Sequence, residues 1–244
     1  ISNKLALSFE KTKKVKNVKN IIFTGNPVRK EFEEIGYNHT NEINLNKSFT
    51  ILIYGGSLGA SYFSRELTSV ICSLPTEIKN KIKVIQQVRV EDLENVKNNY
   101  KTHKIKAEIS VFFYNIYKKF QIADLIITRS GGSSVAEILA SCKPAIFVPL
   151  PTSFENHQFE NAKFFEINNC GWIFDQVKNS ENDFQSLIID IFKNQNKLIS
   201  TSKKLRDLSN KLSNLRKRKT PSDFLSDLIL EMTEDLNKEI KISC

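Results

Sequence analysis

Two glycine pairs stand where backbone groups could hold a phosphate. The segments ILIYGGSLGAS at 51–61 and ITRSGGSSVAE at 127–137 each read as an apolar strand, a glycine turn and the start of a helix. Such a turn lets backbone N–H groups approach a phosphate, and the helix adds its positive N-terminus. A tight connection between strand and helix explains either turn as well. Neither turn matches the G-x-G-x-x-G fingerprint or the P-loop.

Glu137 follows the second glycine pair and has two readings. Ser134 and Glu137 have the spacing of a capping box, with Ser134 at the N-cap and Glu137 three residues later. A carboxylate in the first turn of this helix is also well placed to accept hydrogen bonds from the two hydroxyls of a ribose. The spacing alone does not separate these readings, and both can hold together.

Polar side chains elsewhere add three candidates. Gln158 and Asn161 lie three residues apart on one expected helical face, and their amides donate and accept hydrogen bonds as sugar hydroxyls require. Both are equally ordinary solvated residues. His157 lacks an evident carboxylate partner and reads as a contact or surface residue. Arg29, in GNPVR, offers a fork of donors for a phosphate, or is a surface arginine.

Strands alternate with helices from residue 49 onward. This pattern predicts an α/β fold with a Rossmann-like parallel sheet and helices on both faces. An earlier strand is expected near 20–25, with Pro27 at the start of a short helix. The expected strands are 49–56, 81–88, 107–113, 124–129, 144–150 and 171–175. The expected helices are 59–74, 90–100, 115–123, 135–142, 157–168, 181–193, 195–218 and one that starts near 220.

The composition narrows the class of protein. The chain of 244 residues is 40% hydrophobic and carries a net charge of +9. That charge favours anionic partners such as nucleotide phosphates or anionic lipid, although abundant lysine can also reflect compositional drift. No aromatic and basic motif of an RNA-binding module is present, so nucleic acid is not expected as a partner. No signal peptide is expected, because the start lacks an apolar region and a small-residue cleavage site. A start at Ile1 suggests a fragment, a trimmed sequence or a split gene.

The four cysteines and the last expected helix suggest a reduced protein with one uncovered apolar surface. Cys72, Cys142, Cys170 and Cys244 have no C-x-x-C spacing and read as reduced thiols rather than metal ligands. The last helix repeats apolar residues every four positions, which predicts an amphipathic helix that needs a partner surface. That stripe consists of Phe224, Leu228, Met232, Leu236 and Ile240.

These motifs together resemble one known family. TGNPVR, ILIYGGSLGA, the segment 123–151 and NHQFENA resemble, in order and spacing, the donor half of the MurG family. The resemblance implies the C-terminal half of a GT-B glycosyltransferase. It implies transfer of N-acetylglucosamine (GlcNAc) from UDP-GlcNAc, with inversion, to undecaprenyl-pyrophosphoryl-MurNAc-pentapeptide (lipid I), giving lipid II. It implies no metal or other cofactor, and peripheral attachment to the cytoplasmic side of the bacterial membrane.

The resemblance also assigns roles to single residues. Arg29 corresponds to a phosphate-binding arginine, and Glu137 to the glutamate that holds the ribose hydroxyls. Gln158 corresponds to a glutamine that binds GlcNAc hydroxyls, with Asn161 beside it. The serines of the two turns fall near the uracil and the diphosphate. The full set of expected donor-binding residues is Arg29, Gly56, Ser57, Gly131, Ser133, Ser134, Glu137, Gln158 and Asn161.

The acceptor half of the family has no counterpart in this chain. The expected division is an acceptor-domain remnant at 1–24, an interdomain linker at 25–48, the donor domain at 49–220 and the C-terminal helix at 221–244. The segments VIQQVRVED and FFYNIYKKF depart from the family pattern. The catalytic base is expected outside this chain, in a missing N-terminal domain or a second chain. Two other functions stay open: a non-catalytic UDP-sugar-binding fragment, or a GT-B transferase with another acceptor.

Overall fold

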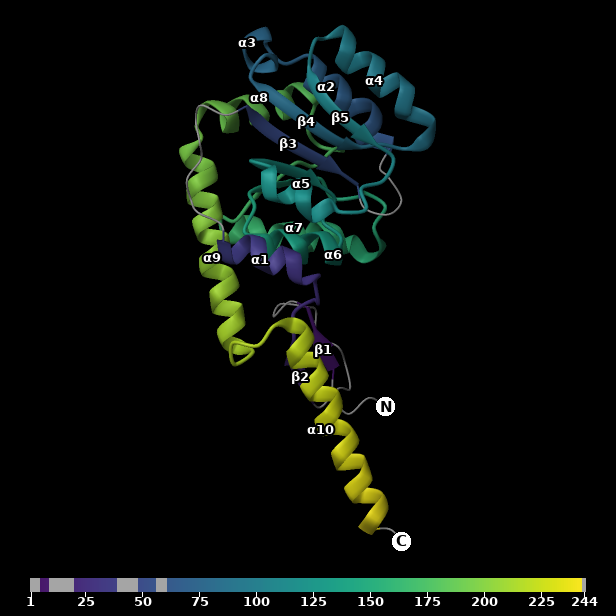
Figure 1. Cartoon of the computed structure of the whole chain (residues 1–244), viewed down its shortest axis with the longest axis vertical. Coiled ribbons are helices and arrows are strands. Elements are labelled where there is room, and N and C mark those ends of the chain that lie inside the picture. Colours follow the sequence, from purple (N-terminus) through teal and green to yellow (C-terminus); the bar gives the residue numbers. More distant parts are fainter. Residues whose placement is uncertain (1–4, 9–19, 39–47, 56–60, 243–244) are drawn as a thin grey trace.

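The computed structural model describes residues 5–8, 20–38, 48–55 and 61–242, with side chains described as far as residue 233. Six parallel strands form the main sheet in the order β5-β4-β3-β6-β7-β8 (Figure 1). This is the expected alternating α/β architecture, and the parallel sheet is confirmed. The strands are β3 Phe49–Tyr54, β4 Ile82–Gln87, β5 Lys106–Ser110, β6 Leu125–Thr128, β7 Ala145–Phe147 and β8 Trp172–Ile173.

Helices follow the strands in the predicted order, with small shifts of their ends. The helix expected at 59–74 contains a π-helical stretch, Phe63–Leu67, that runs directly into α2. A short helix that the pattern did not indicate, α3, precedes β4. The helices are α1 Lys30–Asn38, α2 Thr68–Cys72, α3 Thr76–Lys79, α4 Leu93–Thr102, α5 Ile116–Ile122, α6 Gly132–Ser141, α7 His157–Ile167, α8 Glu181–Lys193, α9 Asn196–Leu215 and α10 Pro221–Ile242.

The two faces of the sheet carry two separate cores. Alternate side chains of β3 point to opposite faces, so Ile51 and Ile53 join one core and Leu52 and Tyr54 join the other. The first core is covered by α2, α4 and α8, and the second by α1, α5, α6, α7 and α9. Since β3 is buried along its whole length, its continuous apolar sequence is the expected signature of a central parallel strand.

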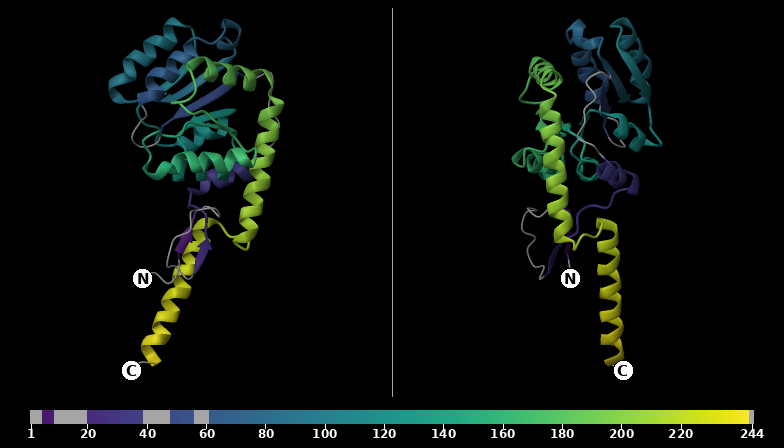
Figure 2. Two further views of the ribbon diagram at one scale, coloured as in Figure 1. Left: turned by 180° about the vertical axis from the view of Figure 1, so that it is seen from behind. Right: turned by 60° about the vertical axis from the view of Figure 1, so that its left-hand side comes forward.

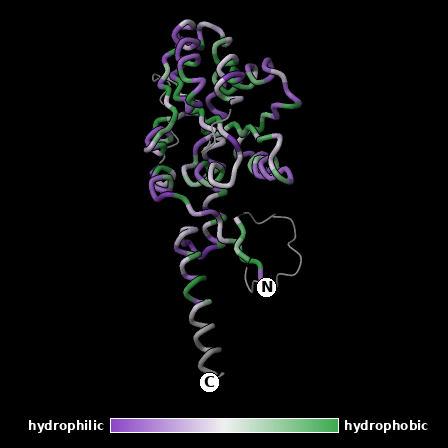
Figure 3. Tube along the Cα trace, turned by 90° about the vertical axis from the view of Figure 1, so that its right-hand side faces the viewer, coloured by the Kyte–Doolittle hydropathy of each residue, from purple (hydrophilic) through white to green (hydrophobic). Residues whose placement is uncertain are grey.

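The chain crosses twice between the sheet and a smaller unit. Strands β1 Leu5–Leu7 and β2 Ile21–Phe23 pair in parallel and form a sheet of their own. Helix α10 runs beside this pair and away from the main sheet (Figures 1 and 2). Hydrophobic residues lie on part of α10, where Ile229 and Leu230 are 60% and 62% exposed (Figure 3). Leu236 and Ile240 of the predicted stripe lie outside the residues whose side chains are described.

Helix α1 lies within the segment expected to be an interdomain linker. It begins at Lys30, three residues after Pro27, and its Phe32 is fully buried in the second core. Gly36 allows α1 to approach α6 closely, because a Cβ at this position would lie 2.0 Å from the backbone oxygen of Ala140. Part of the segment 25–48 therefore packs on the sheet domain, and the division of the chain into four parts stays a prediction.

Replacing Gly36 by alanine tests this close approach. Helix propensity alone favours alanine by about 1 kcal/mol, so a net loss of stability reports the clash with Ala140. We expect the free energy of unfolding to fall by about 1–3 kcal/mol in urea denaturation. The matched control is Gly131→Ala, because a Cβ at Gly131 meets no atom within 4 Å. Equal stabilities of the two variants would contradict the packing of α1 on α6.

Candidate functional site

The strand order reverses between β3 and β6, and open parallel sheets form a ligand crevice at such a reversal. The chain starts the main sheet at β3, adds β4 and β5 on one side, and then adds β6, β7 and β8 on the other. Ligands of open parallel sheets bind beyond the carboxyl ends of the strands at such a reversal. Tyr54 and Thr128, the last residues of β3 and β6, are register partners. Both glycine turns therefore start at the same edge, although Gly56 and Ser57 lie outside the described residues.

The second glycine turn leaves open space at the N-terminus of α6. Gly131 is the N-cap residue, and its φ of −64° is one that any residue adopts. No neighbouring atom lies within 4 Å of the position that a Cβ would take. Neither backbone conformation nor packing therefore requires glycine here. A glycine at this position leaves open space beside the N–H groups of the first helical turn.

The predicted capping box is wrong. The helix begins three residues earlier than the pattern suggests, and no side chain caps it. Ser134 lies inside the first turn and is only 8% exposed, whereas Ser133 is exposed. Glu137 is therefore beyond the first turn and does not bond back to an N-cap N–H. This removes the structural explanation that competed with a ligand-binding role for its carboxylate.

Glu137 lies partly buried at the same edge of the sheet. Its Oε2 accepts a hydrogen bond of 3.3 Å from the Tyr54 hydroxyl at the end of β3. Burial raises the pKa of this carboxyl above its usual value, and the charge of Arg29 and the Tyr54 hydrogen bond lower it in part. Arg29 is exposed, and its guanidinium carbon lies 5.2 Å from the centre of the Phe32 ring. The positive charge of Arg29 thus acts on the same crevice as Glu137.

The amides of α7 are held by the second glycine turn. Asn161 Nδ2 donates to the backbone oxygen of Ser130 at 2.9 Å, and Ser130 Oγ donates to the backbone oxygen of Gln158 at 2.7 Å. Gln158 Oε1 accepts from the Leu150 N–H at 3.0 Å. Within the described part of the chain, Gln158 Nε2 donates to no residue. Asn161 therefore positions the turn, while the NH₂ group of Gln158 is bonded to none of the described residues.

Two contributions were not apparent from the sequence. Tyr54 reads there as part of an apolar strand, and only the pairing of β3 with β6 brings its hydroxyl to Glu137. Phe112 and Tyr114 follow β5 at the carboxyl edge of the sheet, with exposed fractions of 56% and 83% and ring centres 5.1 Å apart. Exposed rings next to a short strand were the available signal. They offer a surface for stacking at this edge.

Arg129, next to the turn, has a structural role, because its Nη1 group is fully used in hydrogen bonds to other elements. This atom donates to the backbone oxygens of Val148 and Pro149 at 2.9 and 3.1 Å and to Gln176 Oε1 at 2.7 Å. Its guanidinium also lies 4.9 Å from the centre of the Phe63 ring. Burial lowers the pKa of Arg129 to about 10. The side chain joins the ends of β6 and β7 to the loop after β8, and so fixes the edge on which the site is built.

Residues 50–218 match the glycosyltransferase family 28 C-terminal domain. The chain belongs to glycosyltransferase family 28. A relative from Wolbachia pipientis subsp. Culex pipiens (strain wPip) is 34% identical over 229 residues, which are 94% of this chain and 63% of the relative. A relative from Rickettsia bellii (strain RML369-C) is 34% identical over 234 residues, 95% of this chain and 63% of the relative. Both are named UDP-N-acetylglucosamine--N-acetylmuramyl-(pentapeptide) pyrophosphoryl-undecaprenol N-acetylglucosamine transferase.

Solved structures agree with this family 28 assignment at the level of the fold. The crystal structure of Acinetobacter baumannii MurG has a TM-score of 0.69 and 23% identity, and the match covers 88% of this chain and 61% of that one. The crystal structure of WaaG, a glycosyltransferase involved in lipopolysaccharide biosynthesis, has a TM-score of 0.55 at 13% identity, with 79% and 50% covered. The predicted C-terminal half of a GT-B glycosyltransferase, and its likeness to the MurG family, are confirmed. The chain spans about three fifths of the curated relatives it matches.

The described part of this family 28 chain was compared with the requirements of a membrane-spanning helix and of a metal site. None of the described helices is long and apolar enough to cross a membrane. The same residues contain no cluster of three or more histidine, cysteine or acidic side chains that would hold a metal ion. Cys72, Cys142 and Cys170 are buried free thiols, and burial raises the pKa of each to about 11.

The raised pKa of Glu137 has a consequence for stability. The folded state binds this proton more tightly than the unfolded state, whose carboxyl titrates near 4.5. At pH values below the unfolded pKa, the carboxyl is neutral in both states and its burial costs little free energy. As the pH rises from the unfolded pKa through the folded pKa, the buried group becomes charged and the free energy of unfolding falls. We expect Glu137→Gln to gain stability relative to the native chain over that window and then to keep a constant difference. Urea unfolding of both proteins between pH 4 and pH 7 measures the difference. A difference that falls with pH would show that Arg29 and Tyr54 outweigh burial.

Proposed function

We propose that this chain is the donor-binding half of an enzyme that transfers GlcNAc from UDP-GlcNAc to lipid I, giving lipid II for peptidoglycan synthesis. One observation carries the proposal: an open helix N-terminus at Gly131 and a partly buried carboxylate at Glu137 share the crevice between β3 and β6. A nucleotide diphosphate needs both an anion site and an acceptor for ribose hydroxyls. The names of the relatives supply the sugar and the lipid acceptor.

In this proposal, the diphosphate and the ribose of UDP-GlcNAc are bound by different groups of the protein. The diphosphate lies at the N-terminus of α6, where N–H groups and the exposed Ser133 hydroxyl donate to it. Ser134 is more buried and lines the base of this turn. We assign Gly56 and Ser57, which lie outside the described residues, to the same phosphates, and Arg29 adds a positive charge. Glu137 accepts from the ribose hydroxyls.

Gln158 binds the sugar through its Nε2 group, which donates to GlcNAc hydroxyls, and Asn161 holds the turn beside it.

In the transfer, the bond between the anomeric carbon and the diphosphate breaks as the C4 hydroxyl of the acceptor attacks from the opposite face. The departing UDP takes the electron pair, and its negative charge grows on the oxygen nearest α6. Fixed donors at that oxygen stabilise the developing charge without reorganisation. No metal or other cofactor is needed for this step, and the base that takes the acceptor proton belongs to the acceptor half.

The partners follow from the same proposal. Lipid I is presented at the cytoplasmic face of the bacterial membrane, so the enzyme works there as a peripheral protein, and the net charge of +9 suits anionic lipid. An N-terminal domain or a second chain completes the acceptor side. Nucleic acid is not proposed as a partner.

A second candidate is a binding module that holds UDP-GlcNAc without turnover. The described residues that support it are those of the crevice between β3 and β6, which could hold UDP-GlcNAc without any acceptor group. A GT-B transferase with another acceptor shares the same donor half, and the nature of the acceptor half separates the two.

Donor binding is tested by calorimetric titration of UDP and UDP-GlcNAc into the folded chain. We expect both to bind, and Glu137→Ala to weaken UDP by about 1–3 kcal/mol because two ribose hydroxyls lose their buried acceptor. Gly131→Ala should weaken UDP as well, without loss of stability, since its methyl group enters the open space beside α6. The control is Glu94→Ala, which removes an exposed carboxylate that pairs with Lys97 at 2.8 Å on α4. Failure of both nucleotides to bind would refute the proposal.

Turnover is tested separately with a lipid I analogue and labelled UDP-GlcNAc. We expect no product from the 244-residue chain alone, because proximity of acceptor, base and donor supplies much of the rate in such a transfer. Adding the N-terminal part of a relative such as the Rickettsia bellii protein, as a fusion, should restore product. Robust product from the chain alone would show that the acceptor side is complete without an N-terminal domain.

A further inference from the structure

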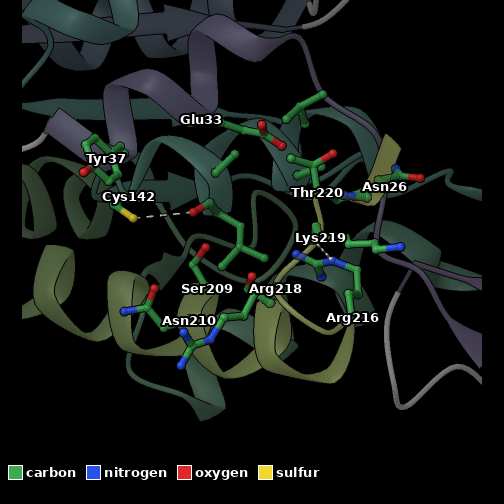
Figure 4. Close-up of a pocket in the computed structure, with 18 of the residues that line it drawn as sticks. Asn26, Glu33, Tyr37, Cys142, Ser209, Asn210, Arg216, Arg218, Lys219 and Thr220 are labelled. Carbon is green, nitrogen blue, oxygen red and sulfur yellow. Dashed lines mark hydrogen bonds between the residues drawn. The ribbon is translucent and has the colours of Figure 1, made fainter. Parts of the chain in front are cut away.

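A cavity, which we call the hinge cavity, lies where the chain crosses between the sheet domain and the β1–β2 unit. It is separate from the donor crevice, the name we give to the expected ligand site beyond the carboxyl ends of β3 and β6. The volume of the hinge cavity is about 430 Å³, and none of the nine expected donor-binding residues lines it. Its walls come from α1, α6, α9 and both crossing segments, 23–28 and 216–221 (Figure 4). A molecule bound here would touch both connections between the two parts of the protein at once.

Positive charge dominates the polar side of this hinge cavity. The basic lining residues are Arg206, Arg216, Arg218 and Lys219, and Glu33 is the acidic one. Arg216 is only 7% exposed, and its Nε donates to the backbone oxygen of Lys219 at 3.2 Å. Among the described residues its Nη groups find no acceptor, and no ion pair joins it to Glu33. Burial lowers the pKa of Arg216, and the charge of Glu33 offsets this only in part.

The other side of the hinge cavity is apolar. Phe23 and Val28 from the first crossing, Leu139 from α6 and Pro221 from α10 contribute hydrophobic surface. The Arg216 guanidinium lies 5.8 Å from the centre of the Phe23 ring, so the charged and apolar walls meet. The Arg216 side chain has lost most of its contact with solvent and its pKa is lowered by burial, so an anion bound beside it would offset part of the cost of burying its charge. A free inorganic anion would leave the apolar wall uncovered.

We propose that the hinge cavity binds a small amphipathic anion, with a phosphate or carboxylate head on Arg216 and an apolar body along Phe23, Val28 and Leu139. Binding joins the two crossing segments and so fixes the β1–β2 unit and α10 relative to the sheet domain. The site regulates how the two parts of the protein are held, and it is independent of the donor crevice.

Decyl phosphate, used below its micelle concentration, is the probe for a calorimetric titration. We expect it to bind the native chain, and inorganic phosphate and decanol to bind at least about tenfold more weakly, because each offers half of the complementarity. Equal affinity for inorganic phosphate would show a plain anion site, and equal affinity for decanol an apolar one. Either result would overturn the proposal.

Three variants locate the binding. Arg216→Gln removes the head-group partner and should weaken decyl phosphate at least tenfold. Ser209→Phe keeps every charge but fills the cavity from α9, and should abolish binding. Lys211→Gln removes one charge from an exposed position of the same helix and should change nothing. UDP titrated into the same samples reports the donor crevice separately, so the two proposals fail independently.

Amide hydrogen exchange gives a second readout. Decyl phosphate should slow exchange in 24–28 and 216–221 of the native chain and leave Ser209→Phe unaffected. If Arg216→Gln does not fold, the comparison between Ser209→Phe and the native chain still decides. Binding of equal strength to Ser209→Phe, or protection confined to other segments, would refute the hinge site.

Discussion

The pairing of β3 with β6 is the constraint on which the rest of the molecule depends. It joins residues 51–54 to 125–128, far apart in the chain, and sets the carboxyl ends of both strands level. Because the two strands are buried on both faces, a slip of one residue would turn Ile51 and Ile53 from one core into the other. The register is therefore fixed by packing. Everything in the donor crevice follows from it, including the meeting of Tyr54 with Glu137.

Two charged groups next to the crevice differ in how fully their hydrogen bonds are satisfied by the protein. Arg129 is buried and has its guanidinium bound to three oxygens, so it stabilises the edge of the sheet and has no role as a ligand. Glu137 has one hydroxyl donor in the described structure and a pKa raised by burial. A carboxylate left short of donors gains most from a ligand that supplies hydroxyl groups. The names of the two curated relatives include UDP-N-acetylglucosamine, a sugar nucleotide whose ribose has such hydroxyls.

The connections between the two parts of the chain are more than linkers. Helix α1 packs on α6 through Gly36, and α9 leads into the second crossing beside the buried Arg216. The donor crevice at the start of α6 and the hinge cavity along its later residues thus share one helix. The two sites therefore share a packed helix, although none of the expected donor-binding residues lines the hinge cavity.

The sequence by itself determined the order and type of the six main strands and of the helices between them, except for α3, and the residues of the second glycine turn. Apolar runs ending in glycine have one good explanation in an alternating chain, which is a parallel strand leading into a helix. The sequence did not determine where α6 begins. Ser134 and Glu137 satisfy the local pattern of a cap, but the open turn at Gly131 and the burial of Ser134 favoured an earlier start.

The tertiary structure alone decided the roles of Tyr54, Arg129, Asn161 and Arg216. Each is defined by a partner distant in the chain or by a cavity wall from another element, and local spacing carries no record of such partners. Even Gly131 became informative only in three dimensions. Its conformation suits any residue, and the reason for a glycine is visible only as the empty space around it. Local propensity and hydrophobic pattern can be read from neighbouring residues, so the elements are predictable from the sequence. A site made by strand pairing and helix packing depends on residues far apart in the chain and exists only once the chain has folded.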